Sequence, residues 1–150
     1  MTEVLFYQLQ RQPLERVLPG LIVRSLERGW RVAVQGAGDE RIRALDDLLW
    51  TYSDESFLPH GLASQADAAD QPVVLAADEG NPNRANIRFL IDNVAEPQDI
   101  GSYERIVVLF DGRFEQSLLS AREQWKRCRD AGHAITYWQQ TAEGRWEKKA

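Results

Sequence analysis

Runs of β-branched and apolar residues alternate along the chain with segments whose apolar positions recur every three to four residues. Strands are predicted at 4–9, 31–35, 72–76, 87–92, 105–110 and 134–138. Helices are predicted at 14–28, from 39 to Trp50, and at 114–130. Alternating strands and helices with short connections predict an α/β fold, a single-domain three-layer Rossmann-like sandwich with a mostly parallel sheet.

Several local signals refine this outline. The run at 105–110 is apolar on both faces, which is typical of a central strand. Pro19 either starts the first helix or kinks it, and Gly29 is a good C-terminal stop. Residues 61–71 are small and polar, so a mobile loop is expected there. The charged end of the chain, at about 143–150, is expected to be a frayed tail.

Length and charge narrow the class of protein. The chain has 150 residues, 43% hydrophobic and 27% charged, as in an ordinary single globular domain. Its formal net charge is −5, and its pI is near 5.1. An acidic balance argues against broad nucleic-acid binding but leaves room for a local basic patch.

Cysteine and histidine usage excludes several kinds of site. Cys128 is the single cysteine and lies on the apolar stripe of its helix, so we expect a buried structural thiol in a reducing, cytoplasmic protein. His60 and His133 are the two histidines, and neither has a second ligand at metal-binding spacing. The N-terminus has no signal-peptide pattern, and no apolar run is long enough to span a membrane. We therefore expect no metal, cofactor or membrane contact.

The Gly36-x-Gly38 turn follows a strand and opens a helix, as a phosphate-binding turn would. The third glycine of a dinucleotide fingerprint is absent, and no Gly-Lys-Ser/Thr follows. Asp39 and Glu40 would also repel a pyrophosphate at this helix entry. A helix N-cap explains the turn better, and the alternative function is a Rossmann-like nucleotide-binding enzyme that uses it.

The helix at 114–130 carries an apolar stripe formed by Phe114, Leu118, Ala121, Trp125 and Cys128. Arg122 and Arg129 border the stripe, and Lys126 lies further round. One interpretation is an amphipathic core helix with a solvated basic edge. The other is an apolar pocket for a peptide that ends in an aromatic residue, whose free carboxylate Arg122 would bind through two hydrogen bonds.

The segment from 45 to 60 is unusually apolar for a connection. Ile42, Leu45 and Leu49 share one helix face, and Trp50 lies off it. Helical order should end near 53–54, which leaves Tyr52, Phe57, Leu58 and His60 in an irregular segment. Either this segment folds onto the core, or it is a docking surface for another protein.

The order and spacing of several short pieces resemble one family. They are Phe6-Tyr7, Arg31-Val32, a helix ending Leu-x-x-x-Leu-Trp at Trp50, Glu-Ser-Phe-Leu-Pro-His at 55–60, Ala121-Arg122-Glu123 with Lys126, and Ala131-Gly132. Together they resemble the chi subunit of bacterial DNA polymerase III holoenzyme over most of the chain. The resemblance implies one Rossmann-like domain over 1–150. It also implies a non-catalytic adaptor that links the clamp loader, through its psi partner, to single-stranded DNA-binding protein.

The resemblance also implies two partner sites. Arg122, Trp125 and Lys126 match family positions that bind the acidic C-terminal tail of single-stranded DNA-binding protein, with Arg129 and Leu118 beside them. Leu118 departs from the family pattern, which has a lysine there. Trp50 and Phe57, with Leu58, match positions that hold psi or an XPD-like helicase. Contact with DNA is then expected only through these partners.

Overall fold

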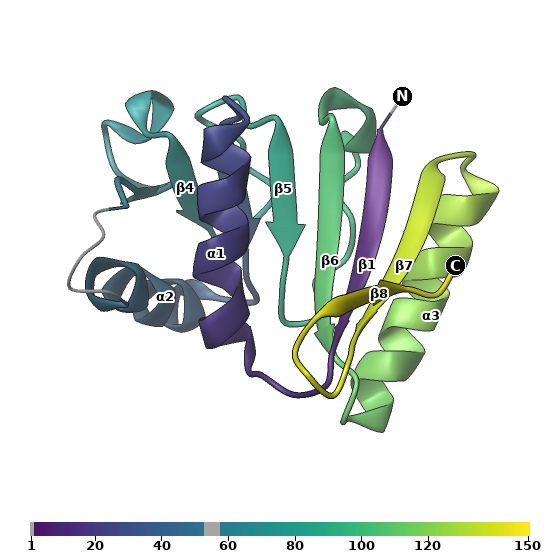
Figure 1. The fold of residues 1–150 in the computed structure, drawn as a ribbon. Coiled ribbons are helices and arrows are strands. Elements are labelled where there is room, and N and C mark those ends of the chain that lie inside the picture. Colours follow the sequence, from purple (N-terminus) through teal and green to yellow (C-terminus); the bar gives the residue numbers. More distant parts are fainter. Residues whose placement is uncertain (1, 53–57) are drawn as a thin grey trace.

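The computed structural model describes residues 2–52 and 58–150 (Figure 1). The elements are β1 (Glu3–Leu9), α1 (Leu14–Glu27), β2 (Val32–Gln35), α2 (Asp39–Thr51), β3 (Gly61–Leu62), β4 (Val73–Ala76), β5 (Ile87–Leu90), β6 (Arg105–Asp111), α3 (Glu115–Asp130), β7 (Ala134–Gln140) and β8 (Trp146–Lys148). Two 3-10 turns lie at Ala68–Asp70 and Ile100–Ser102. The strands form one sheet in the order β3-β4-β2-β5-β6-β1-β7-β8, parallel except for the antiparallel pair β7 and β8. The predicted α/β class and mostly parallel sheet are confirmed.

The side chains of the sheet divide into two apolar layers. One layer packs under α1 and α2, where Leu18 and Leu45 meet Val34 and Val107 of the sheet. The other packs under α3, where Cys128 contributes to the core. Because neighbouring residues of a strand point to opposite faces, each central strand supplies both layers, which gives the predicted three-layer sandwich.

Strand β6 has the central position that its apolar run predicts. It lies between β5 and β1, and Ile106 to Phe110 are all buried. Within the described ranges, 2–52 and 58–150, no helix is long and apolar enough to cross a membrane.

Of the two alternatives for the first helix, a start at Pro19 is wrong. The helix begins at Leu14 and continues through Pro19, so Pro19 does not open it. Gly29 follows the last turn with φ +83°, and this left-handed conformation is the stop signal that the sequence predicted.

Two predicted irregular segments contain regular structure. Within 61–71, β3 pairs with β4, Gly61 opposite Val74, and Ala68 is buried. The predicted frayed tail is wrong for Trp146–Lys148, which pairs with β7 as β8. The Trp146 ring stacks on Tyr7 of β1 with centroids 4.7 Å apart, and this long-range contact has no signature in the local composition.

Candidate functional site: a cleft beside helix α3

A cleft of about 360 Å³ lies between α3 and the neighbouring strands β6 and β7. Its lining residues are Phe110, Leu118, Ala121, Arg122, Trp125, Lys126, Arg129 and Tyr137. All five residues that the sequence proposed on this helix therefore line one cavity. The strands supply two further rings, Phe110 and Tyr137, which the helical period could not predict. Strand alternation does place each of them on this face of the sheet.

Aromatic rings form the floor of the cleft. Trp125 is half-buried, and its indole meets the fully buried ring of Phe6 edge-on. It also meets the Tyr137 ring with centroids 5.9 Å apart. The Tyr137 hydroxyl donates a hydrogen bond to the side-chain amide oxygen of Gln8. Burial raises the pKa of Tyr137, while the positive charge of Arg122 acts in the opposite direction. The floor is thus an apolar surface held in place from three elements.

Positive charges form the rim. Arg122 and Lys126 are exposed, and within residues 2–52 and 58–150 neither takes part in an ion pair. Arg129 has its Nε 3.2 Å from a carboxylate oxygen of Asp130, and both side chains are exposed, so water screens this contact. The Arg122 guanidinium is therefore available to a carboxylate from outside the chain.

Helical spacing explains why these side chains gather. Leu118, Arg122, Trp125 and Arg129 follow one another at intervals of three or four residues, which places them along one side of α3. Cys128 points to the core instead; it is 2% exposed, and burial raises the pKa of its thiol to about 11. The prediction of a buried structural thiol is confirmed.

Phe114 does not share the stripe, and its predicted place there is wrong. The helix begins at Glu115, and Phe114 precedes it with an extended backbone. Its side chain is 60% exposed. The helical period does not apply before the first turn, so the apolar stripe begins at Leu118.

The opposite side of α3 carries an arginine in a different state. Arg127 donates from Nε and Nη2 to the two carboxylate oxygens of Glu96, at 2.9 and 3.0 Å. Its guanidinium is thus engaged within the chain, whereas that of Arg122 is not. The two residues on one helix form a natural pair for comparison.

The second predicted site lies at the end of α2 and is only partly described. Trp50 is 48% exposed, and its ring centroid lies 4.3 Å from that of His60. Leu58 is 3% exposed and packs in the core, so the expectation that it faces a partner is wrong. Phe57 lies outside the described residues.

Buried hydrogen bonds explain why Leu58 is held inside. The His60 side chain is fully buried, with Nε2 2.9 Å from a carboxylate oxygen of Asp46 and Nδ1 2.8 Å from the Leu58 carbonyl oxygen. These contacts tie residues 58–60 to α2. Of the two interpretations of this segment, folding onto the core holds for Leu58 and His60.

The Gly36–Gly38 turn is shaped by packing. A Cβ atom on Gly36 would lie 3.1 Å from Cδ1 of Ile42 and 3.3 Å from a carboxylate oxygen of Asp92. The Ala37 N–H donates to that same carboxylate oxygen. The Asp92 carboxylate thus occupies the side of the turn that a phosphate would approach. The close contacts around Gly36 give this glycine a structural role.

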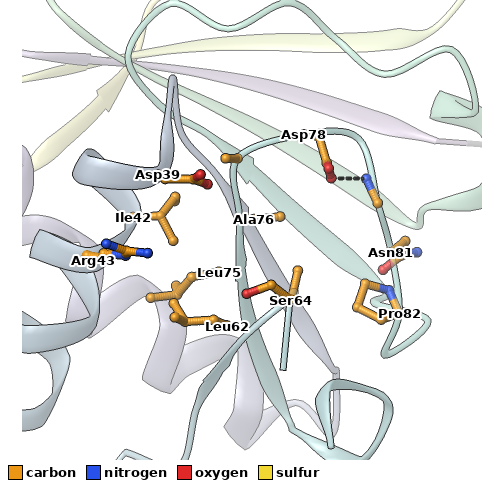
Figure 2. Close-up of a pocket in the computed structure, with 13 residues that line it drawn as sticks. Asp39, Ile42, Arg43, Leu62, Ser64, Leu75, Ala76, Asp78, Asn81 and Pro82 are labelled. Atoms are coloured by element: carbon orange, nitrogen blue, oxygen red, sulfur yellow. Dashed lines mark hydrogen bonds between the residues drawn. The ribbon is translucent and has the colours of Figure 1, made fainter. Parts of the chain in front are cut away.

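Another cavity, of about 730 Å³, opens between the start of α2 and the end of β4 (Figure 2). Ile42 and Leu75 give it an apolar side. Asp39 and Arg43 line it from α2, and Asp78 lines it from the other side. Asp78 accepts a hydrogen bond from the Gly80 N–H, drawn in Figure 2. Carboxylates at the helix entry make this a poor place for a nucleotide phosphate.

The fold and the α3 cleft define a small α/β protein with an apolar cleft and positively charged side chains at its rim. The sequence matches the family described as DNA polymerase III chi subunit, HolC, over residues 1–136, and the chain belongs to this family of accessory subunits of the replicative holoenzyme.

Two curated relatives agree with this assignment. The chain is 29% identical over 143 residues to the DNA polymerase III subunit chi of Pseudomonas aeruginosa, which covers 90% of this chain and 94% of that protein. It is 32% identical over 73 residues to a probable DNA polymerase III subunit chi of Rickettsia prowazekii, which covers 45% of this chain and 44% of that protein. The second match thus spans less than half of the relative.

Proposed function

We propose that this chain is a non-catalytic adaptor of the replication machinery. Its α3 cleft binds the acidic C-terminal tail of single-stranded DNA-binding protein, and the side of the molecule around Trp50 binds psi or an XPD-like helicase. The observation that carries the proposal is the half-buried ring of Trp125 beside the Arg122 guanidinium, which lacks an ion pair in the described part of the chain.

The cleft suits the last residue of such a tail. An aromatic side chain would enter the apolar part, against Trp125 and Tyr137. Its terminal carboxylate would accept two parallel hydrogen bonds from Arg122. Lys126 and Arg129 would attract acidic residues upstream in the peptide, because like-signed charges at the rim raise the local potential.

A cavity of about 360 Å³ accommodates one or two side chains, so each contact is weak. A partner that presents several tails binds with higher apparent affinity, because a released tail is replaced by another at high effective concentration. The adaptor then needs only a modest cleft to remain on a multivalent partner.

The second face would supply the link to the holoenzyme. A large, exposed and rigid ring such as Trp50 is typical of protein-interface anchors. This contact is mainly apolar, so salt should weaken it less than the tail contact.

Calorimetry with two peptides tests the tail site. Both are acidic and end in phenylalanine, one with a free carboxylate and one amidated. We expect the free peptide to bind and the amide to lose most of the affinity, and Arg122→Ala to cost about 1–3 kcal/mol. Arg127→Ala is the matched control on the same helix, outside the cleft. Equal binding of both peptides, or an equal loss in the two variants, would contradict the proposal.

A further inference from the structure

A second positively charged cavity lies on the other face of the sheet. It has a volume of about 430 Å³ and opens between α1 and the strands β5, β6 and β1. Tyr7 and Val107 of the sheet line it, and the guanidinium groups of Arg24, Arg28 and Arg105 surround it. In Figure 1, α1 lies toward β4 and β5, and β8 crosses in front of the sheet near β6 and β1.

Strand alternation separates this cavity from the α3 cleft. Phe6 and Tyr7 are neighbours in β1, so their side chains point to opposite faces. Phe6 packs against Trp125 under the α3 cleft, and Tyr7 lines the second cavity. The two sites are therefore divided by the sheet and can be occupied at the same time.

Tyr7, Arg28 and Arg105 line this cavity, and each also contacts a tryptophan ring outside the lining. Tyr7 stacks on Trp146 with an interplanar angle of 26° and meets Trp138 edge-on. The guanidinium carbons of Arg28 and Arg105 lie 3.9 and 5.1 Å from the centre of the Trp30 ring. Flat rings held beside fixed positive charges are the two components of a surface that binds single strands.

The local charge differs in sign from that of the whole chain. The formal net charge is −5, yet three arginines line this cavity against one acidic residue, Glu27. Arg105 is paired with Glu3 at 2.8 Å. Over the described ranges, Arg24 and Arg28 form no ion pair with a carboxylate. Burial raises the pKa of Tyr7, and the charges of Arg105 and Arg24 act in the opposite direction.

We propose that this face binds single-stranded DNA directly, with a base against Tyr7 in the cavity and backbone phosphates on Arg24 and Arg28. A nucleotide strand carries a phosphate at every step for the arginines and a flat base for the Tyr7 ring, so it supplies both components along its length. The site is independent of tail binding, and it would let the adaptor contact DNA next to the protein that coats it.

Fluorescence anisotropy with a labelled oligothymidylate tests this, using the full chain at low salt. We expect Arg24→Ala/Arg28→Ala to weaken binding about tenfold or more and to lower the slope of log affinity against log salt by about 1.4. Tyr7→Leu should weaken binding about fivefold or more through lost stacking. Thermal melting checks that each variant is folded, and if Tyr7→Leu does not fold, the arginine pair decides.

Two control variants make the outcome specific. Arg43→Ala removes an exposed arginine of α2 and should leave oligonucleotide affinity unchanged. Arg122→Ala should also leave oligonucleotide affinity unchanged but should weaken binding of the acidic peptide. This difference separates the proposed site from the α3 cleft. The proposal is overturned if the oligonucleotide does not bind. It is also overturned if the double variant binds as well as the parent, or if an acidic peptide displaces the strand from the arginines at equal concentration.

Discussion

The indole of Trp125 lies edge-on against the ring of Phe6, with centroids 5.5 Å apart and planes at 60°. Phe6 is fully buried in the central part of the sheet, whereas Trp125 lines the cleft. The floor of the cleft is thus an outer extension of the core, and in the proposed function its shape would be set before the partner binds. Such preorganisation lowers the entropy lost on binding.

Trp125→Ala should therefore reduce both stability and peptide affinity. Because the indole is only half-buried, we expect a loss of about 2 kcal/mol in the free energy of unfolding, below the value for a fully buried tryptophan. Peptide affinity should fall by about 1–3 kcal/mol. Urea unfolding and calorimetry measure the two effects. Trp125→Phe keeps an aromatic floor and should restore most of the binding; if it does not, the ring is not the anchor.

Leu118→Lys should strengthen the binding of an acidic tail. Leu118 lines the same cavity one turn before Arg122, so an ammonium group there would face the acidic part of the peptide. We expect a gain of about 0.3–1 kcal/mol at low salt, which disappears as salt screens the exposed pair. Calorimetry at two ionic strengths measures it. An equal gain at high salt would point to a contact other than charge.

Arg88 is fully buried in β5, and its charge has no carboxylate partner among the bonds it makes. Its Nε and Nη2 donate to the side-chain oxygen of Gln35. Nη2 also donates to the Asp78 carbonyl oxygen, and Nη1 donates to the Gly80 carbonyl and the Tyr103 hydroxyl. These five bonds use all five donors of the guanidinium and hold the loop after β4 on the sheet.

Arg88→Met should cost about 3 kcal/mol of stability, because it leaves several buried acceptors without a donor. Arg88→Lys keeps the charge but has a different donor geometry, so it should also be clearly destabilised. Urea unfolding measures both. The exposed Arg43→Met is the control and should change stability by less than about 0.5 kcal/mol. A neutral result for Arg88→Met would show that the loop does not depend on this network.

The pair formed by Arg127 and Glu96 predicts a pH dependence. Burial by itself would raise the pKa of the Glu96 carboxyl. The hydrogen bonds from Arg127 and from the backbone together outweigh burial, so the pKa lies below its usual 4.5. A depressed carboxyl pKa contributes stability above the unfolded value, and that contribution is lost as pH falls through the folded value.

Arg127→Gln should therefore cost less stability at acidic pH than at neutral pH. We expect the variant to be less stable at pH 7 and the gap to be smaller at pH 3, because the contribution of the ionised Glu96 begins to be lost as the pH falls below 4.5. Urea unfolding at the two pH values measures the gap. A constant gap would show that Arg127 stabilises the fold by packing and not through the Glu96 charge.

Local periodicity alone determined much of this protein. The strand and helix segments follow from apolar positions that repeat about every 2 residues in a strand and about every 3.6 in a helix. These periods depend only on backbone geometry. The same period placed Arg122 and Trp125 on one side of a helix and Cys128 toward the core. These features need no knowledge of what the helix packs against.

Only the tertiary structure decided the rest. Tyr137 completes the α3 cleft because β7 lies beside β1, and Trp146 is ordered because it stacks on Tyr7, contacts between residues far apart in the chain. Leu58 is drawn into the core, and Arg88 is buried where backbone oxygens from another loop compensate its charge. The free energy of a long-range contact depends on which partner it meets, and a sequence pattern records only one of the two sides.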